Sequence, residues 1–72
     1  MLEAVSAGQV ELILEITDRL EIHREAVVIP LPKRGAGQVR RRPDGKLEIV
    51  VPAEREFGDW LGELEGALRD LV

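Results

Sequence analysis

The sequence predicts an α+β fold in which a four-stranded antiparallel β-meander is covered on one face by a C-terminal α-helix. Three observations lead to this fold class. Apolar and polar residues alternate in the first third of the chain, a proline and a glycine mark a turn in the middle, and leucines recur at helical spacing near the end. A chain of 72 residues is sufficient for one small core, so residues 1–72 are expected to form a single domain.

The first two strands are expected near residues 9–17 and 20–30. From Val10 to Ile16 the even positions are apolar and the odd positions are mainly polar, with Ile13 as the exception. This alternation is typical of a half-buried strand. Because it continues beyond the ordinary length of one strand, a short turn is expected to fold it into a hairpin. The pairing keeps the apolar side chains on one face.

An N-terminal helix near residues 7–24 is the alternative for the same segment. Ser6 can serve as its N-cap, and Gln9 follows at the spacing of a capping box. Val10 and Ile13 also gather on one side of a helical wheel. This alternative gives the order α-β-β-β-α, and the sequence leaves both interpretations open.

A second hairpin is expected from strands near residues 37–42 and 46–51. Between them, Pro43 and Gly45 occupy the positions that a type I turn with a bulge requires. The turn sets three cross-strand pairs: Arg42 with Lys46, Arg40 with Glu48, and Val39 with Ile49. The inward face is then formed by Val39, Leu47, Ile49 and Val51, with Arg41 among them.

A helix is expected near residues 54–71. Glu54 and Glu56 lie in its first turn, where the partial positive charge of a helix N-terminus favours acidic side chains. Its apolar stripe consists of Phe57, Trp60, Leu61, Leu64, Leu68 and Leu71. This spacing allows the helix to cover the sheet.

Composition excludes several classes of site. The chain has no cysteine and a single histidine, His23, so it cannot form disulfides, thiolate zinc sites or paired-histidine zinc sites. Ser6 and Thr17 are its only hydroxyl-bearing residues, which leaves little for nucleophilic catalysis. We therefore expect no enzyme activity, catalytic residues, metal or cofactor. With 33% charged residues and no apparent secretory signal, we expect a cytoplasmic protein without a membrane partner.

Basic residues concentrate in the middle of an otherwise acidic chain whose net charge is −4. The candidate anion-binding residues are Lys33, Arg34, Arg40, Arg41 and Arg42. Arginine offers a planar pair of donors to carboxylate and phosphate groups, so this cluster suggests binding of an acidic protein or a nucleic acid. The same charges would also protect an edge strand from aggregation.

Three glycines recur every four residues along the predicted C-terminal helix. The candidate interface residues are Gly58, Gly62 and Gly66, together with Trp60. A glycine row permits close approach of another helix, whereas tryptophan at Trp60 suits either an interface or a core. Because a small sheet covered on one face leaves the other open, we expect a homodimer or larger homo-oligomer. The leading functional prediction is a non-enzymatic interaction or assembly module; the alternative is an anion or nucleic-acid binder.

Overall fold

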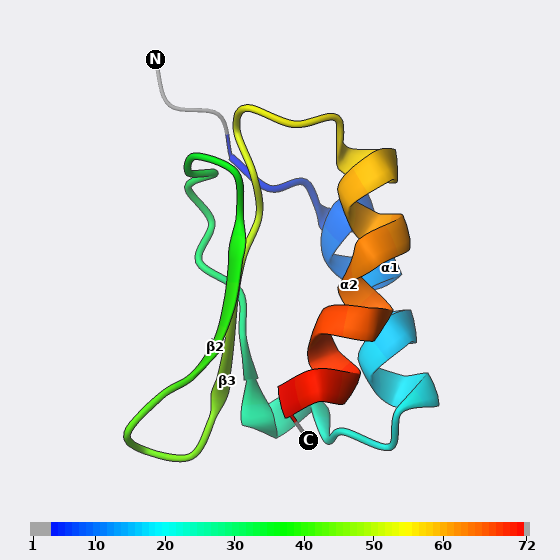
Figure 1. The fold of residues 1–72 in the computed structure, drawn as a ribbon, viewed down its shortest axis with the longest axis vertical. Helices are drawn as coiled ribbons and strands as arrows, with labels where there is room; N and C mark the ends of the chain where they lie inside the picture. The colour runs from blue at the N-terminus through cyan, green and yellow to red at the C-terminus, as the bar shows by residue number, and fades with distance from the viewer. Residues whose placement is uncertain (1–3, 72) are drawn as a thin grey trace.

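The computed structural model describes residues 4–71. In this range the fold is α+β and has two layers, with two α-helices on one side and a three-stranded sheet on the other (Figure 1). The elements in chain order are α1 (Ala7–Arg19), the 3-10 helix η1 (Arg24–Ala26), β1 (Val27–Val28), β2 (Gln38–Arg41), β3 (Leu47–Val50) and α2 (Phe57–Leu71).

The first predicted hairpin is wrong, because residues 9–17 lie within helix α1. The helical alternative is confirmed, although the helix ends at Arg19 and not near residue 24. Burial explains the error. Ile13, the exception to the alternating pattern, is fully buried, whereas Leu12 on the apolar row is 45% exposed.

Local interactions define both ends of α1. At its start, the Ser6 side chain accepts a hydrogen bond from the Gln9 main chain, and the Gln9 side chain accepts one from the Ser6 main chain, each at 3.1 Å. At its end, Glu21 adopts a left-handed conformation with φ of 61°. The main-chain N–H of Ile22 then donates to the Thr17 carbonyl at 2.9 Å, which completes a Schellman cap.

The sheet is mixed, with strand order β1-β3-β2. β1 pairs in parallel with β3, placing Val27 opposite Leu47, and it replaces the long strand predicted at 20–30. The second predicted hairpin is confirmed, including the pairing of Arg40 with Glu48. The predicted four-stranded antiparallel meander is therefore corrected to three strands, because the chain bends through η1 before reaching the sheet.

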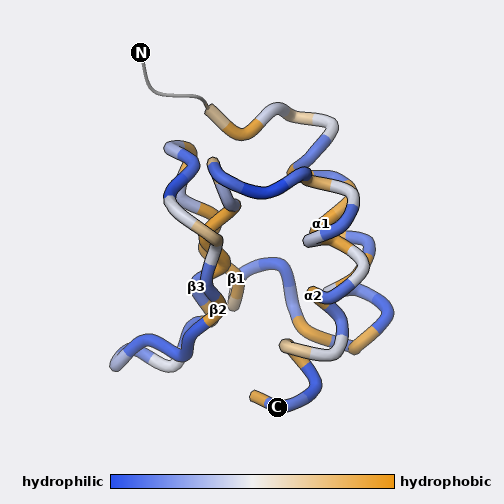
Figure 2. Tube along the Cα trace, turned by 45° about the horizontal axis from the view of Figure 1, so that its top comes forward, coloured by the Kyte–Doolittle hydropathy of each residue, from blue (hydrophilic) through white to orange (hydrophobic). Residues whose placement is uncertain are grey.

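The core lies between the sheet and the helices. Its buried apolar residues are Val5, Ile13, Ile16, Leu47, Ile49, Val51, Trp60, Leu64 and Leu68. Helix α2 begins at Phe57, three residues after the predicted start, and the Glu56 carboxylate accepts a hydrogen bond from the main chain of Asp59 at 3.2 Å. The tip of the β2–β3 hairpin extends from the body and is hydrophilic (Figure 2).

Candidate functional site

One face of the sheet is open, because both helices pack against the other face (Figure 1). Successive side chains of a strand point to opposite faces. On β3, Leu47 and Ile49 are buried under the helices, which directs Glu48 and Val50 to the open face. Val28 and Pro30 extend this surface, and both are half-buried, as Val50 is. The open face therefore has an aliphatic area beside a carboxylate.

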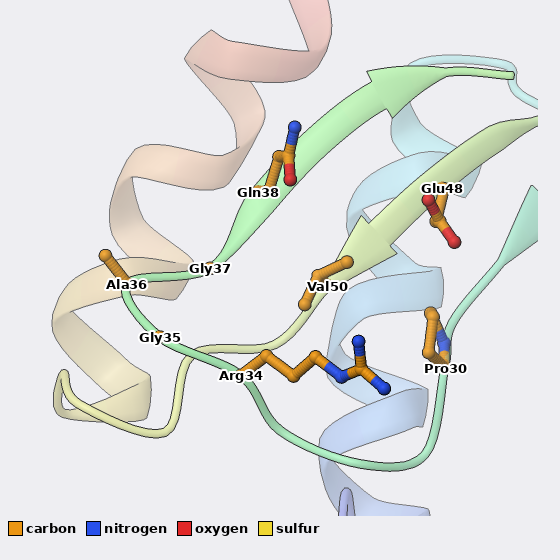
Figure 3. A pocket seen from close by; sticks show the side chains of 8 residues that line it. All are labelled: Pro30, Arg34, Gly35, Ala36, Gly37, Gln38, Glu48 and Val50. Atoms are coloured by element: carbon orange, nitrogen blue, oxygen red, sulfur yellow. The ribbon is translucent and has the colours of Figure 1, made fainter.

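A pocket of about 470 Å³ lies on the open face (Figure 3). It is lined by Pro30, Arg34, Gly35, Ala36, Gly37, Gln38, Glu48 and Val50. Main-chain bonds hold the loop that forms it: the Arg34 N–H donates to Val51 at 2.9 Å, and the Gly37 N–H donates to Arg34 at 3.1 Å. The exposed Arg34 side chain extends across the pocket toward Pro30. A cationic group and an aliphatic wall thus share one shallow surface.

The five candidate anion-binding residues do not form one surface. Arg40 donates to the Glu48 carboxylate at 2.6 Å across the hairpin, and Arg42 forms an ion pair with Asp44 at 3.2 Å. Arg41 points to the helix side and donates to the Leu71 carbonyl at 2.7 Å. The remaining two differ in exposure, since Lys33 is half-buried and Arg34 is exposed. The alternation of side chains along β2 separates neighbours that the sequence places together.

A second pocket, of about 240 Å³, lies between β2 and α2. We call it the β2–α2 groove; it is lined by Ala36, Gly37, Gln38, Val39, Arg55, Trp60, Glu63, Leu64 and Ala67. Trp60 is 5% exposed and belongs to the core while also lining this groove. The Arg55 guanidinium and the Glu63 carboxylate form an ion pair on the rim.

The glycine row of α2 is exposed, but its members have different neighbours. Gly58 and Gly62 line a pocket between the two helices, beside Leu12. A Cβ atom added at Gly62 or Gly66 would have no other atom within 4 Å, so neither position is in close contact with the rest of the described chain.

Two carboxylates have shifted ionisation. The Arg24 hydrogen bond lowers the pKa of Asp18, and the Arg55 hydrogen bond lowers the pKa of Glu63. Both carboxylates are therefore ionised at neutral pH and are held in ion pairs. Arg24 also lies 3.6 Å from the Glu11 carboxylate, so it connects η1 to α1.

Both hydroxyl groups have structural roles. The Ser6 hydroxyl caps α1, and the buried Thr17 hydroxyl donates to the Leu14 carbonyl at 2.9 Å. Between residues 4 and 71, no group of three His, Cys, Asp or Glu side chains is placed to hold a metal ion. Within the same range, no helix is long and apolar enough to cross a membrane.

The sequence analysis missed both pockets as sites. Pro30 and Val50 meet only because β1 lies beside β3, and Gly37 meets Trp60 only because α2 packs over the hairpin. No local pattern signals either contact. Comparison with known proteins identifies no match, whether the chain is compared with family models, curated proteins or solved structures.

Proposed function

We propose that this protein is a non-enzymatic, cytoplasmic interaction module that self-associates through the open face of its sheet. The observation that supports this proposal is the position of both helices on a single face. Among the described residues, no helix or strand covers the other face, which retains the half-buried side chains of Val28, Pro30 and Val50 beside the loop at 34–37. A second copy of the chain can bury them.

The charges on this face are compatible with a two-fold contact between copies. Such a contact requires a surface that is complementary to itself. The open face contains the guanidinium of Arg34 and the carboxylate of Glu48, so each copy offers both signs of charge beside the same aliphatic area. The exposed Arg34 of one copy can face the Glu48 carboxylate of the other, which also accepts a hydrogen bond from Arg40 of its own copy.

The dimensions of the molecule limit the area that a contact through this face can bury. The molecule measures 33 × 24 × 21 Å, and the sheet is seen nearly edge-on along the shortest axis (Figure 1). The rectangle normal to the intermediate axis is roughly 700 Å², so the open face within it is smaller than the ~800 Å² that each partner buries in a standard interface.

Sedimentation velocity over a range of micromolar concentrations tests the proposal. We expect the unmodified chain to sediment as a dimer and the Val50→Lys variant to sediment as a monomer, because the new ammonium group would be buried without a partner. Leu12→Lys is the matched control: it places lysine at an exposed apolar position on the helical side and should leave the dimer intact.

A monomer for the unmodified chain at every concentration would disprove the proposal. If both lysine substitutions dissociate the dimer equally, the interface does not lie on the open face. Circular dichroism of both variants shows whether each retains its fold. A single anion site formed by the whole basic cluster has less support, since Arg41 points to the helix side whereas Arg40 bonds Glu48 on the open face.

A further inference from the structure

The outer edge of β2 has main-chain groups directed away from the sheet. In an antiparallel pair, hydrogen-bonded positions alternate with positions whose N–H and C=O groups point outward. The Arg42 N–H donates to the Lys46 carbonyl at 2.7 Å, which makes this a hydrogen-bonded position. The register then assigns Val39 and Arg41 to the outward-pointing class. No strand in residues 4–71 pairs with this edge.

The β2–α2 groove lies directly beside this edge. β2 and α2 run side by side (Figure 1), with Val39 on the strand wall of the groove. From the helix, the exposed Ala67 lines the groove together with the nearly buried Trp60 and Leu64. The groove volume of about 240 Å³ accommodates an aliphatic side chain. An exposed strand edge next to an apolar groove is the arrangement that binds extended peptides by strand addition.

We propose that the β2 edge and the β2–α2 groove bind an extended acidic segment of another protein, which adds as a fourth strand beside β2. The side chain opposite Val39 would point to the helix side and enter the groove, because cross-strand neighbours share a face. The side chain opposite Arg40 would point to the open face, where a carboxylate would share the Arg40 guanidinium with Glu48, which accepts from it at 2.6 Å. The ligand therefore alternates Asp or Glu with an aliphatic residue.

Charge favours an acidic peptide over a second copy of β2. Residues 33–48 contain six of the ten basic side chains and two of the fourteen acidic ones, which gives a net charge of +4 in a chain of −4. Pairing β2 with another β2 would bring Arg40 and Arg41 close to the same residues of the partner. Like charges facing each other destabilise a sheet, so the edge resists self-pairing. The β2 edge and the groove are separate from the open face used for self-association, and the two proposed contacts meet only near Arg40.

Trp60 provides a direct measurement because it is the only tryptophan and lines the groove. The probe is a short synthetic peptide of alternating Glu and Val with blocked ends, and the matched control peptide has Lys in place of Glu. We expect the acidic peptide to change Trp60 fluorescence saturably and to bind at least about tenfold more tightly than the control peptide. This difference in affinity should become smaller at high salt.

Hydrogen exchange tests the strand pairing. Bound peptide should slow amide exchange at Val39 and Arg41, the two positions directed outward. The Arg41→Pro variant removes one outward N–H, whereas Arg41→Ala retains it, and both lose the contact with Leu71. We expect the proline variant to bind the peptide about tenfold more weakly than the alanine variant.

A second pair of variants tests the groove without altering the strand. Ala67→Gln fills it from an exposed helical position, and Ala7→Gln makes the same change at an exposed alanine outside every described pocket. We expect only Ala67→Gln to weaken binding. Equal binding of the two peptides, or unchanged affinity for Ala67→Gln, would overturn the proposal. The proposal would also fail if, without peptide, amide exchange at Val39 slowed as the protein concentration rose. That result would identify a second copy of the chain as the occupant.

Discussion

Gly37 is a residue at which the loop before β2 closely approaches helix α2. Its φ is +82°, in the left-handed region that side chains rarely adopt. A Cβ atom there would lie 2.9 Å from Trp60 Nε1, 3.0 Å from Pro52 Cδ and 3.1 Å from the Val50 carbonyl oxygen. Both the backbone conformation and the available space therefore require glycine.

Replacing Gly37 by alanine should lower the free energy of unfolding by about 2–4 kcal/mol, the sum of left-handed strain and overpacking. Urea denaturation measures this change. Gly45→Ala is the control, because Gly45 has φ of +88° but no atom within 4 Å of an added Cβ. It should lose only about 1–2 kcal/mol. Equal losses at both glycines would show that crowding by Trp60, Pro52 and Val50 contributes nothing.

At the scale of single residues, the sequence predicted which side chains carry charge but not which of them meet. Arg40 and Glu48 were paired correctly because the hairpin turn determines their register. Arg41 was placed on the inward face, yet its bond to the Leu71 carbonyl depends on where α2 ends. Such contacts between distant segments leave no local pattern.

Helix α1 ends in a cap that uses an unfavourable residue. Glycine usually occupies the left-handed position of a Schellman cap, but here it is Glu21, with φ of 61°. The absence of glycine removed an ordinary sign of a helix end from the sequence. The cap bonds form nevertheless, so the left-handed conformation stores strain.

Replacing Glu21 by glycine should therefore raise the free energy of unfolding by about 0.5–1 kcal/mol. Thermal and urea denaturation both report this gain. The same substitution at Glu15, which is exposed in the middle of α1, should instead cost about 1 kcal/mol. A loss of stability for both variants would contradict the cap geometry.

The segment that became α1 satisfied two patterns at once. Apolar residues on even positions fit a strand, whereas the capping box at Ser6 and Gln9 fits a helix. Ile13 distinguishes the two: it lies off the strand pattern but is fully buried in the helix. In contrast, the β2–β3 hairpin and α2 carried turn and stripe signals with only one interpretation, so both were predicted closely.

For the molecule as a whole, ion pairs on the surface join neighbouring segments in addition to the core contacts. Arg24 joins η1 to Asp18 in α1, and Arg55 joins the loop before α2 to Glu63 within that helix. Arg19 of α1 also contacts Glu65 of α2 at 3.1 Å. Acid should loosen these connections because each depends on an ionised carboxylate.

The Glu63→Gln variant tests the contribution of one pair to stability against pH. The pKa of Glu63 is lowered in the fold by Arg55, from an ordinary value of 4.5. The unfolded state therefore binds the proton more readily, and the pair stabilises the fold above pH 4.5 and progressively less below it. The melting temperature of the variant should be slightly lower at neutral pH, and the difference should disappear in acid.

Glu25→Gln is the control for this measurement, because Glu25 is exposed and lies in no ion pair with another described residue. Its melting temperature should follow that of the unmodified chain across the range. If the difference in melting temperature between Glu63→Gln and the unmodified chain persisted at low pH, the contribution of Glu63 would not depend on its charge.

The strand order has a consequence for synthesis of the chain on the ribosome. β1 precedes its partner β3 by about twenty residues, and β3 is the central strand. At roughly 5–20 residues per second, β1 must wait about 1–4 s before its partner is made. During that interval the apolar faces of α1 and β1 have no sheet or second helix to cover them. Until β3 and α2 are made, α1 and β1 therefore present apolar surface of the kind that chaperones bind.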